Sequence, residues 1–404
     1  MRYPTYIKNC ITLLEKSGYR AYAVGGAVRD SLLGKEPFDW DVTTSATPDE
    51  ILSVFEDYKT IPTGIKHGTV TVLCDDNDKK ATVEITTFRI DGEYGDSRHP
   101  KEVHFSNELQ DDLSRRDFTV NAMAFNEKEG IIDVFEGKKD LENHIIRAVG
   151  DPEKRFSEDA LRILRAFRFS AQLGFTIEEK TLLGIKKCAH LLHKISRERI
   201  GIEFKRLLAS SGVEYALQNM VELDVWQNIF DVPCPSAPMI SKLPSLNDNR
   251  FAVRLAAIAS EYTDAEKEMF LASLRLSNAE KRLIYRLCGV KNFQIPENRE
   301  KYPFAARHFL HLYNNICDNA IEMLAFFNEG DLVDFTLAIE LEKSRDNPLT
   351  VSDLAVKGDD ILPLCNGDFS KVGKTLAILL RRVWENPSLN NREQLIEIAR
   401  KELE

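Results

Sequence analysis

The feature that most constrains this chain is the stretch from residue 21 to residue 44, which reads AYAVGGAVRDSLLGKEPFDWDVTT. Its first four residues are apolar enough to form a short buried strand. Gly25 and Gly26 then allow the backbone to turn sharply and to approach a ligand closely. Residues 27–33 have the pattern of a helix, whose free N–H groups would point back at the glycines. The stretch therefore predicts a strand, a tight corner and a helix start that suits phosphate oxygens.

Two acidic residues follow this corner. Asp39 and Asp41 flank Trp40, and in an extended segment residues two apart project from the same face. Two converging carboxylates beside a phosphate cradle suit Mg²⁺ in phosphoryl chemistry. Arg29, one turn into the helix, could hold phosphates from the side. Each piece alone is weak, because a Gly-Gly pair is usually a plain corner and a D-x-D pair is usually solvated surface.

Length and composition bound the rest of the interpretation. At 404 residues we expect two to four domains, and a hydrophobic content of 43% with 29% charged residues describes an ordinary globular protein. The net charge of -10 argues against non-specific coating of nucleic acid, although it permits a local basic track. The seven cysteines show no C-x-x-C spacing, which suits a reducing compartment and excludes the usual zinc frameworks. With no leader pattern and no apolar run of membrane-spanning length, we expect a soluble, cytoplasmic protein without a membrane partner.

Strand and helix signals are segregated along the chain. Residues 5–17 have helical spacing, Thr47 begins a capped helix, and two β-rich segments cover residues 67–74 and 81–88. Strand-rich sequence ends near Phe88, and from about Glu108 the pattern is helical almost throughout. This segregation predicts an α+β fold, with a small mixed-sheet head followed by an all-α remainder. Soft boundaries occur at residues 231–249 and 294–303, where proline is frequent.

A second cluster of polar residues, RRDFTVNAMA, spans residues 115–124. Two adjacent arginines in this position can simply be solvated, with Asp117 as an ordinary helix cap. A third cluster, DPEKRFSEDALRILRAFRF, spans residues 151–169. Ser157 is expected to cap a helix that begins at Glu158, on which one acidic and three basic residues recur every three positions: Asp159, Arg162, Arg165 and Arg168. That spacing forms an oblique ridge, which is either a solvated surface or one wall of a pocket.

Together these clusters resemble a known family. The pattern GGxVRDxLLG followed by DxD is similar to the head signature of the nucleotidyltransferase superfamily, in the branch that holds bacterial tRNA nucleotidyltransferases (CCA-adding enzymes) and poly(A) polymerases. RRDFTxNAMA and EDxLRxLRAxRF resemble the next motifs of that branch, and ISRERIGIEFKRLL at residues 195–208 resembles the last. The resemblance implies a class II enzyme with a nucleotidyltransferase head (1–138), a helical neck that recognises the nucleotide base (139–210), a helical body (211–300) and a helical tail that binds tRNA (301–404).

The resemblance also assigns roles in the head. Asp39 and Asp41 would be the catalytic residues and the ligands of Mg²⁺, with Glu84 as a candidate third carboxylate. Gly26 and Arg29 would bind the nucleotide at the corner. Arg116 would contact the nucleotide, and Asn121 would order the adjoining loop or the ribose.

In the neck, the resemblance implies that Asp159 and Arg162 read the Watson–Crick edge of the incoming nucleotide. A carboxylate accepts from an exocyclic amino group and a guanidinium donates to a ring nitrogen, a pair of partners that cytosine and adenine both offer. Uracil and guanine present the reverse, so a mismatch would leave buried groups unpaired. Arg165 and Arg168 would shape the pocket or hold phosphates.

Two further segments have expected roles. The loop at residues 89–105, with Arg89, Asp91, Asp96 and Arg98, is either a plain solvated connection or the lever that such enzymes use when they change nucleotide. Residues 195–208 are expected to brace the helix that carries Asp159, with a core stripe on one side and a solvated side made of Glu198, Arg199, Glu203 and Lys205.

The implied activity is template-independent addition of CCA to a tRNA that lacks all or part of its 3′ end, from CTP and ATP, with release of pyrophosphate. The last segment, residues 357–399, resembles the tail that grips the tRNA backbone. Two alternatives within the class are a specialised A-adding enzyme and a bacterial poly(A) polymerase. A third is a non-catalytic RNA-binding relative. The sequence leaves open whether the protein is a monomer or a homodimer.

Overall fold

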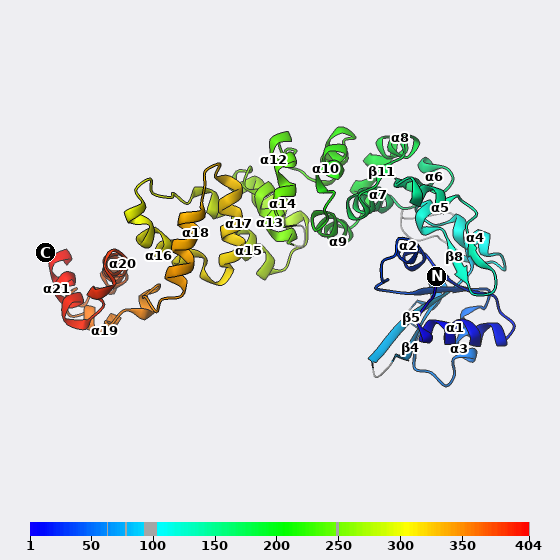
Figure 1. The fold of residues 1–404 in the computed structure, drawn as a ribbon, viewed down its shortest axis with the longest axis horizontal. Helices are drawn as coiled ribbons and strands as arrows, with labels where there is room; N and C mark the ends of the chain where they lie inside the picture. Colours follow the sequence, from blue (N-terminus) through cyan, green and yellow to red (C-terminus); the bar gives the residue numbers. More distant parts are fainter. Residues whose placement is uncertain (63, 77–78, 93–102, 248–249, 404) are drawn as a thin grey trace. The chain divides into compact units, whose positions relative to one another are not determined.

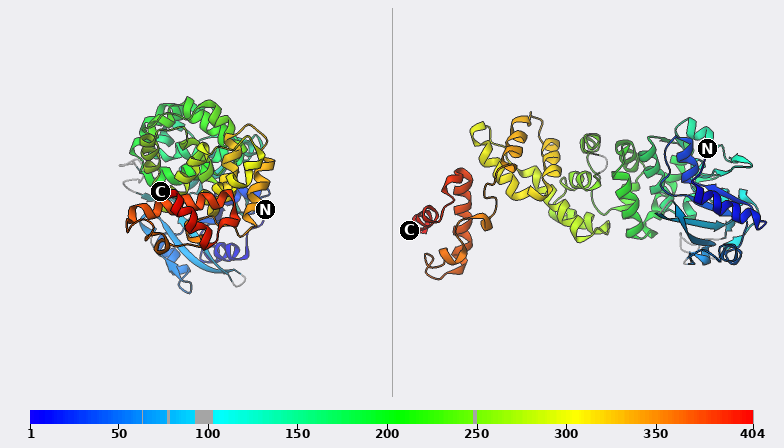
Figure 2. Two further views of the ribbon diagram at one scale, coloured as in Figure 1. Left: turned by 90° about the vertical axis from the view of Figure 1, so that its left-hand side faces the viewer. Right: turned by 60° about the horizontal axis from the view of Figure 1, so that its bottom comes forward.

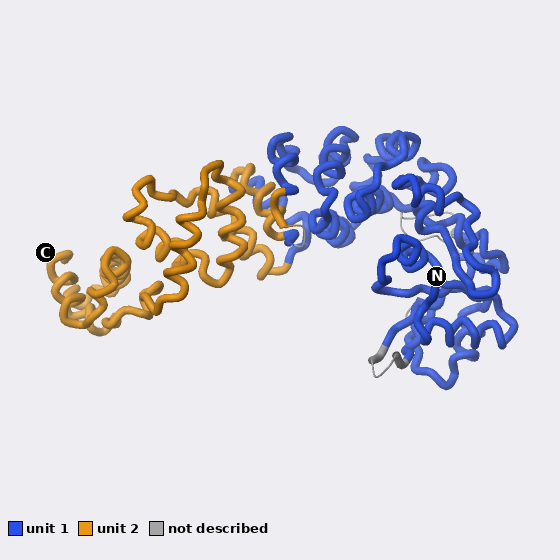
Figure 3. Tube along the Cα trace, viewed as in Figure 1, with its two compact units in different colours: residues 1–244, 248–251, 264–276 blue, residues 245–247, 252–263, 277–404 orange. Residues whose placement is uncertain are grey.

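The structure of the chain is a computed structural model that describes residues 1–62, 64–76, 79–92, 103–247 and 250–403. It divides into two compact units (Figure 3). Unit 1 contains residues 1–244, 248–251 and 264–276, and unit 2 contains residues 245–247, 252–263 and 277–404. The finer division into head, neck, body and tail remains a prediction.

Unit 1 begins with a seven-stranded sheet in the order β3-β4-β5-β2-β1-β8-β9 (Figure 1). Within this sheet β2 and β5 are parallel and the other neighbouring pairs are antiparallel, so the expected mixed sheet is confirmed. Its strands are β1 (Ala21–Val24), β2 (Asp41–Thr44), β3 (Thr60–Ile61), β4 (Thr69–Asp76), β5 (Lys79–Thr87), β8 (Ala124–Asn126) and β9 (Gly130–Ile132).

The strand and helix that the glycine corner joins form where the sequence predicts them. All four residues of β1 are buried, and β1 lies between β2 and β8. The helix α2 (Gly26–Leu32) follows directly. On one face of the sheet α1 (Thr5–Lys16) buries Ile7, Ile11 and Leu14. It packs there beside α3 (Pro48–Val54), as the ribbon views show (Figures 1 and 2). α3 starts with the expected capping box of Thr47 and Glu50.

Strand-rich sequence does not end near Phe88, and that expectation is wrong. β6 (Arg89–Asp91) pairs with β7 (Val103–Phe105), and β8 and β9 return to the large sheet beside β1. These strands have three residues each, too few to show an alternating pattern. The return of β8 has a consequence for the site: the backbone N–H of Gly25 donates to the carbonyl of Met123 at 3.2 Å, which ties the glycine corner to the RRDFTVNAMA segment.

The remainder of unit 1 is mainly helical. A short parallel pair, β10 (Ile145–Ile146) and β11 (Thr176–Ile177), is its other strand element. The helices α6 and α8 pack together, as do α7 and α9. The helices of this part are α4 (Leu109–Ser114), α5 (Gly137–Glu142), α6 (Pro152–Glu158), α7 (Leu161–Leu173), α8 (Glu179–Cys188), α9 (Arg197–Leu208), α10 (Val213–Glu222), α11 (Val225–Ile229), α12 (Ala237–Lys242) and α14 (Asp264–Ser273).

Unit 2 is built of helices throughout its described residues, as expected for the second half of an α+β chain. Near its C-terminal end an apolar cluster includes Leu379, Val383 and Leu395. Deeper in the unit, buried Arg307 forms an ion pair with Glu342 at 2.7 Å. Its helices are α13 (Phe251–Ala259, all but its first residue), α15 (Asn278–Gly289), α16 (Tyr302–Tyr313), α17 (Cys317–Phe327), α18 (Val333–Lys343), α19 (Gly358–Ile361), α20 (Phe369–Glu385) and α21 (Arg392–Leu403). Within the described residues, no helix combines the length and the apolar character needed to cross a membrane.

Candidate functional site

The glycine corner is a close-packed turn. Gly25 has a φ of 78°, in the region that favours glycine, and a Cβ atom there would lie 3.0 Å from Nη1 of Arg116. Gly26 begins α2. Arg29 is on the next turn, but its guanidinium is not free: Nε donates to Asp30 at 2.8 Å and Nη1 donates to Oδ1 of Asn121 at 2.6 Å. Arg29 therefore fixes the corner to the RRDFTVNAMA segment in this structure.

The two acidic residues lie at the start of β2, the strand that runs parallel to β5, and just before it. Asp39 and Asp41 are exposed while Trp40 and Val42 are buried, the alternation expected of an extended segment whose acidic residues share one side. Asp41 begins β2 and faces Val24, the last residue of β1, on one neighbouring strand. On the other neighbouring strand it faces Glu84. The candidate third carboxylate is thus the register partner of Asp41.

The electrostatics at this edge are those of a crowded group of like charges. Although Asp41 is an exposed residue, desolvation by the surrounding protein raises the pKa of its carboxyl to about 6. The Arg116 guanidinium opposes the shift, and the carboxylates of Glu84 and Asp39 add to it. Among the described residues, neither Asp39 nor Asp41 forms an ion pair. The same residues contain no group of three or more His, Cys, Asp or Glu side chains placed to hold a metal ion. Two carboxylates are nevertheless enough for Mg²⁺, which keeps water and substrate phosphate ligands.

The arginines of the second cluster share one buried acid. Asp112 on α4 is fully buried and forms ion pairs with Arg115 at 2.6 Å and with Arg116 at 3.1 Å. Burial raises the pKa of Asp112, but the two guanidinium groups outweigh it, so the net pKa is lowered. Arg116 has one unsatisfied donor: its Nε is buried and has no hydrogen-bond partner among the described residues. An unsatisfied buried donor next to Gly25 is consistent with the predicted contact of Arg116 with a nucleotide.

Asp117 is the residue whose importance the sequence analysis missed. Its carboxylate accepts from the Phe118 N–H at 2.9 Å, from Asn121 Nδ2 at 3.1 Å and from Arg165 Nε at 2.7 Å. Burial opposes ionisation, but the Arg165 guanidinium and the Asn121 amide bring the pKa of Asp117 to about 2. Asp117 thus joins the second cluster to α7. Arg165 is far away along the chain, so no local spacing could have revealed the pair.

The expectation of one helix beginning at Glu158 is wrong. α6 ends at Glu158 and α7 begins at Leu161, while Asp159 between them has an extended backbone with φ -143° and ψ 102°. The Asp159 carboxylate accepts from the Leu161 N–H at 3.1 Å, so the side chain stabilises the start of α7. Ser157 is not a cap and donates instead to the Lys154 carbonyl at 2.9 Å. Asp159 therefore precedes the ridge of arginines and is not part of it.

Asp159 and Arg162 are adjacent, but each has other partners. The carboxylate of Asp159 accepts from both guanidinium nitrogens Nη1 and Nη2 of Arg199, at 3.3 and 2.8 Å. Arg162 is 9% exposed and donates to Glu158 at 2.7 Å and to the Arg115 carbonyl at 2.8 Å. The predicted base-reading pair is therefore engaged within the protein.

Residues 195–208 contain α9, which packs against α7, while Asp159 lies just before α7 and not on it. Part of this contact is made by a charge that was expected to be solvated. Glu203 of α9 is 6% exposed and forms an ion pair with Arg168 at 2.5 Å, without good hydrogen-bond geometry. Glu203 is thus a correction to the expected solvated side. Arg199 is partly exposed and pairs with Asp159. The core stripe is confirmed: Ile200, Phe204, Leu207 and Leu208 are buried.

The ring of Phe169 lies close to arginine side chains from both the glycine corner and the ridge on α7. The guanidinium of Arg168 lies 3.9 Å from the ring centroid, and those of Arg29 and Arg165 each lie 5.2 Å from it. One aromatic ring on α7 thus contacts an arginine from the glycine corner and two from the predicted base-reading ridge. The structure brings these sequence-predicted residues to one place. Their binding of a nucleotide remains a prediction.

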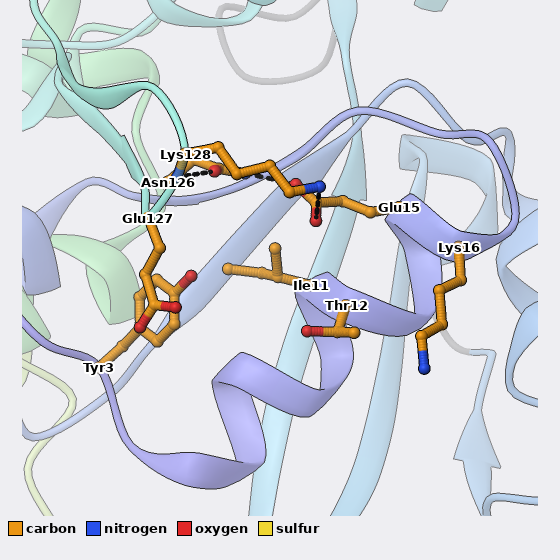
Figure 4. Close-up of a pocket in the computed structure, with 8 residues that line it drawn as sticks. All are labelled: Tyr3, Ile11, Thr12, Glu15, Lys16, Asn126, Glu127 and Lys128. Atoms are coloured by element: carbon orange, nitrogen blue, oxygen red, sulfur yellow. Dashed lines mark hydrogen bonds and ion pairs between the residues drawn. The ribbon is translucent and has the colours of Figure 1, made fainter.

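Two other features lie outside this site. A pocket of about 290 Å³ lies between α1 and the end of β8, lined by residues that include Tyr3, Glu15 and Lys128 (Figure 4). Asn126 at its edge donates to the carbonyl of Ala21, so the pocket is at the opposite end of β1 from Asp41. Of the expected lever loop, residues 93–102, with Asp96 and Arg98, lie outside the described residues, so its role stays a prediction.

Comparison with known proteins gives consistent matches. Residues 21–147 match the family described as poly A polymerase head domain, and residues 174–237 match a probable RNA and SrmB-binding site of polymerase A. A CCA-adding enzyme of Enterococcus faecalis is 37% identical over 404 residues, covering 96% of this chain and 94% of the relative. A CCA-adding enzyme of Ligilactobacillus salivarius is 48% identical, but over about half of its length (55%). The crystal structure of the Bacillus stearothermophilus CCA-adding enzyme in complex with CTP has a TM-score of 0.82 at 28% identity, covering 100% of this chain and 98% of that one.

Proposed function

Since this chain belongs to the family of CCA-adding enzymes, we propose that it is a class II tRNA nucleotidyltransferase that adds CCA to tRNA 3′ ends from CTP and ATP. The observation that carries the proposal is the juxtaposition at the end of β1. There the glycine corner, the Asp39–Asp41 pair and the buried donor of Arg116 meet within one unit. A close backbone approach, two open carboxylates and an arginine are the parts that nucleotidyl transfer needs.

We propose that Asp39 and Asp41 hold Mg²⁺. The mutual repulsion that contributes to the raised pKa of Asp41 is what a divalent cation would relieve. When bound, such an ion supplies charge neutralisation for the triphosphate and acidifies the attacking 3′-hydroxyl. The protein's own contributions are to hold the two carboxylates on one side of the chain and to place Arg116 beside the glycine corner. Glu84, adjacent in register, is the candidate for a further ligand.

The protein groups proposed to select the base are Asp159 and Arg162. In the structure they are held by Arg199 and by Glu158, so base recognition would exchange these partners for the amino group and ring nitrogen of cytosine or adenine. Arg165 and Arg168 are proposed to shape the pocket, because each is paired with a buried acid, Asp117 or Glu203. Phosphate contact by either would require breaking such a pair, which costs several kcal/mol for a buried charge, so we favour the shaping role.

The partners that follow are CTP, ATP and a tRNA that lacks all or part of its CCA end. We propose that the helices of unit 2 bind the folded tRNA by shape and phosphate contacts, because the substrate's form is constant while its sequence varies. The location that suits this substrate, and seven cysteines without a disulfide, is the cytoplasm.

A single incorporation experiment tests the proposal. Purified protein is incubated with Mg²⁺, labelled CTP or ATP, and a tRNA transcript that ends before the first C, after the first C or after the second C of the CCA end, and the products are resolved at nucleotide resolution. We expect two C residues and then one A, with none of these products from Asp41→Asn protein purified in parallel. That variant controls for contaminating host enzyme.

The rivals within the class give different products. Addition of A alone to the transcript ending in CC would identify a specialised A-adding enzyme, and a long A tail would identify a poly(A) polymerase. Absence of any incorporation by protein that still binds the transcript would support a non-catalytic relative and contradict the proposal.

A further inference from the structure

Two cysteines that are distant in the sequence lie side by side in the head. Cys10 on α1 and Cys74 on β4 have their Sγ atoms 3.5 Å apart, in thiol-to-thiol hydrogen-bond contact. Both side chains belong to the core cluster between α1 and the sheet, and they are 1% and 4% exposed. Neither takes part in the candidate site described above. The close approach of two sulfur atoms from different elements is a feature that a hydrophobic core alone does not require.

Both cysteine residues also line a pocket. It has a volume of about 200 Å³, and its other lining residues are Tyr6, Asn9 and Tyr58. The two cysteines thus border one pocket although they are buried. A molecule the size of hydrogen peroxide is far smaller than this pocket.

Bond formation needs only a short movement. A disulfide has its sulfur atoms about 2.0 Å apart, so the two Sγ atoms must approach each other by roughly 1.5 Å, and cysteine side chains can cover part of this by rotation about χ1. The hydrogen bond between the two thiols and, after it, burial raise the pKa of Cys10, so the pair is held as two thiols at neutral pH and oxidation is expected to be slow. None of the seven cysteines, all of which lie within the described residues, is in a disulfide.

We propose that Cys10 and Cys74 are an oxidation site at which a peroxide forms a disulfide between α1 and β4. One sulfur attacks a peroxide oxygen, the O–O bond breaks, and a sulfenic acid forms as one water leaves. The second thiol then attacks the sulfenic sulfur, the S–S bond forms, and the hydroxyl leaves as a second water. The two thiols lose two electrons and two hydrogens in total, and the peroxide accepts them. The link would close a loop from residue 10 to residue 74 and so restrict the unfolded head.

The test maps the cysteines of the full-length wild-type chain. Reduced protein is freed of reductant, treated with hydrogen peroxide, alkylated under denaturing conditions and digested for mass spectrometry. We expect one cross-linked peptide pair that contains Cys10 and Cys74, lighter than the sum of the two peptides by two hydrogens. The product should revert on reduction, and the other cysteines should be recovered in alkylated form.

Two controls make the assignment specific. Cys10→Ala should abolish the cross-link, whereas Cys188→Ala, which removes a buried cysteine of the same unit, should leave it unchanged. In addition, the oxidised wild-type protein should unfold at a higher temperature than the reduced protein, a shift that Cys10→Ala should lack. Recovery of Cys10 and Cys74 as separate alkylated or sulfinic residues, or a cross-link of either to another cysteine, would overturn the proposal. Because it uses the wild-type chain, this mapping decides the matter even if a variant folds poorly.

Discussion

The two halves of the candidate site differ in whether their charged side chains have oppositely charged partners. In the head, Asp39 and Asp41 face outward and form no ion pair among the described residues. Desolvation, with the nearby carboxylates of Glu84 and Asp39 adding to it, raises the pKa of Asp41 to about 6. In the neck, Asp159 and the three arginines of the ridge each have an oppositely charged partner within 3 Å, for example Asp159 with Arg199 and Arg168 with Glu203.

This difference indicates how the two halves would work. A group of unneutralised carboxylates gains free energy by binding a cation, which fits the proposed uptake of metal and triphosphate by the head. The charged residues of the neck already have ion-pair partners, and a base can bind to them only by replacing these partners. A wrong base, whose hydrogen-bonding groups do not match, gains no free energy from that exchange. Selectivity can therefore arise in the neck, because a base that cannot replace the existing partners leaves buried groups unpaired.

The largest effect is expected from removing one carboxylate of the head. Asp39→Asn or Asp41→Asn should lower the rate of nucleotide transfer by on the order of 10³-fold or more, because several kcal/mol of charge stabilisation are lost. Single-turnover incorporation of CTP measures this, with tRNA affinity measured in parallel and expected to be nearly unchanged. Asp57→Asn, which changes an exposed acid of the same domain, is the control. Near-normal transfer in either site variant would refute the assignment of Asp39 and Asp41 as metal ligands.

The next effect concerns discrimination. Arg162→Ala should reduce the preference for CTP and ATP over UTP and GTP by roughly 10²-fold, since a guanidinium that rejects the wrong bases is gone. Arg162 also holds Glu158 and the Arg115 carbonyl, so Arg162→Lys is measured alongside to keep the charge. Arg206→Ala, an exposed arginine on α9, is the matched control. Unchanged rejection of UTP and GTP in a folded Arg162→Ala protein would show that the ridge does not read the base.

A smaller effect is expected on stability at Asp117, which joins the head motif to α7. Asp117→Asn should lower the free energy of unfolding at pH 7 by about 2 kcal/mol, because the Arg165 guanidinium loses its buried partner. The pKa of Asp117 is depressed to about 2 in the folded protein, so the stabilisation is present above pH ~4, the ordinary range of an Asp, and is lost as the pH falls through about 2.

Urea unfolding of wild type and Asp117→Asn at pH 7 and at pH 3 measures both parts of this prediction. The difference between the two proteins should shrink at the lower pH. A difference that is constant with pH would mean that the carboxylate acts through packing and not through its charge.

The smallest effect should come from the Arg199–Asp159 pair. Arg199→Ala removes the partner that Asp159 must give up to accept a base, and it should lower the KM for CTP by about threefold, the range of a partly exposed pair, with kcat little changed. Arg199→Lys should return the KM part of the way to the wild-type value. If Arg199→Ala instead raised the KM, the pair would be positioning Asp159 and not competing with the base for it.

The parts of this structure that could be predicted from sequence are those with local signals. The β1 strand, the glycine corner, the Thr47 cap and the alternation around Trp40 depend on neighbouring residues, and all form as expected. The short strands β8 and β9 and the break at Asp159 could not be predicted. The strands have too few residues to show a period. The break depends on a hydrogen bond that the Asp159 carboxylate accepts from the Leu161 N–H, which competes with helix formation.

The ion-pair partners of the neck residues could not be predicted from the sequence, for a related reason. Asp117 with Arg165 and Asp159 with Arg199 are separated by tens of residues, so no spacing rule applies to them. Glu203 was expected in solvent because helical periodicity identifies the side opposite the apolar stripe, and it gives no sign that a buried arginine, Arg168, lies against that side.

The most direct test of the account is a crystal structure of this protein with CTP and Mg²⁺. We expect the cytosine amino group within hydrogen-bond distance of the Asp159 carboxylate, a ring acceptor within reach of the Arg162 guanidinium, and the triphosphate beside Asp39 and Asp41. A cytosine bound elsewhere, with the pairs of Asp159 with Arg199 and of Arg162 with Glu158 unchanged, would contradict the central claim that these neck residues choose the nucleotide.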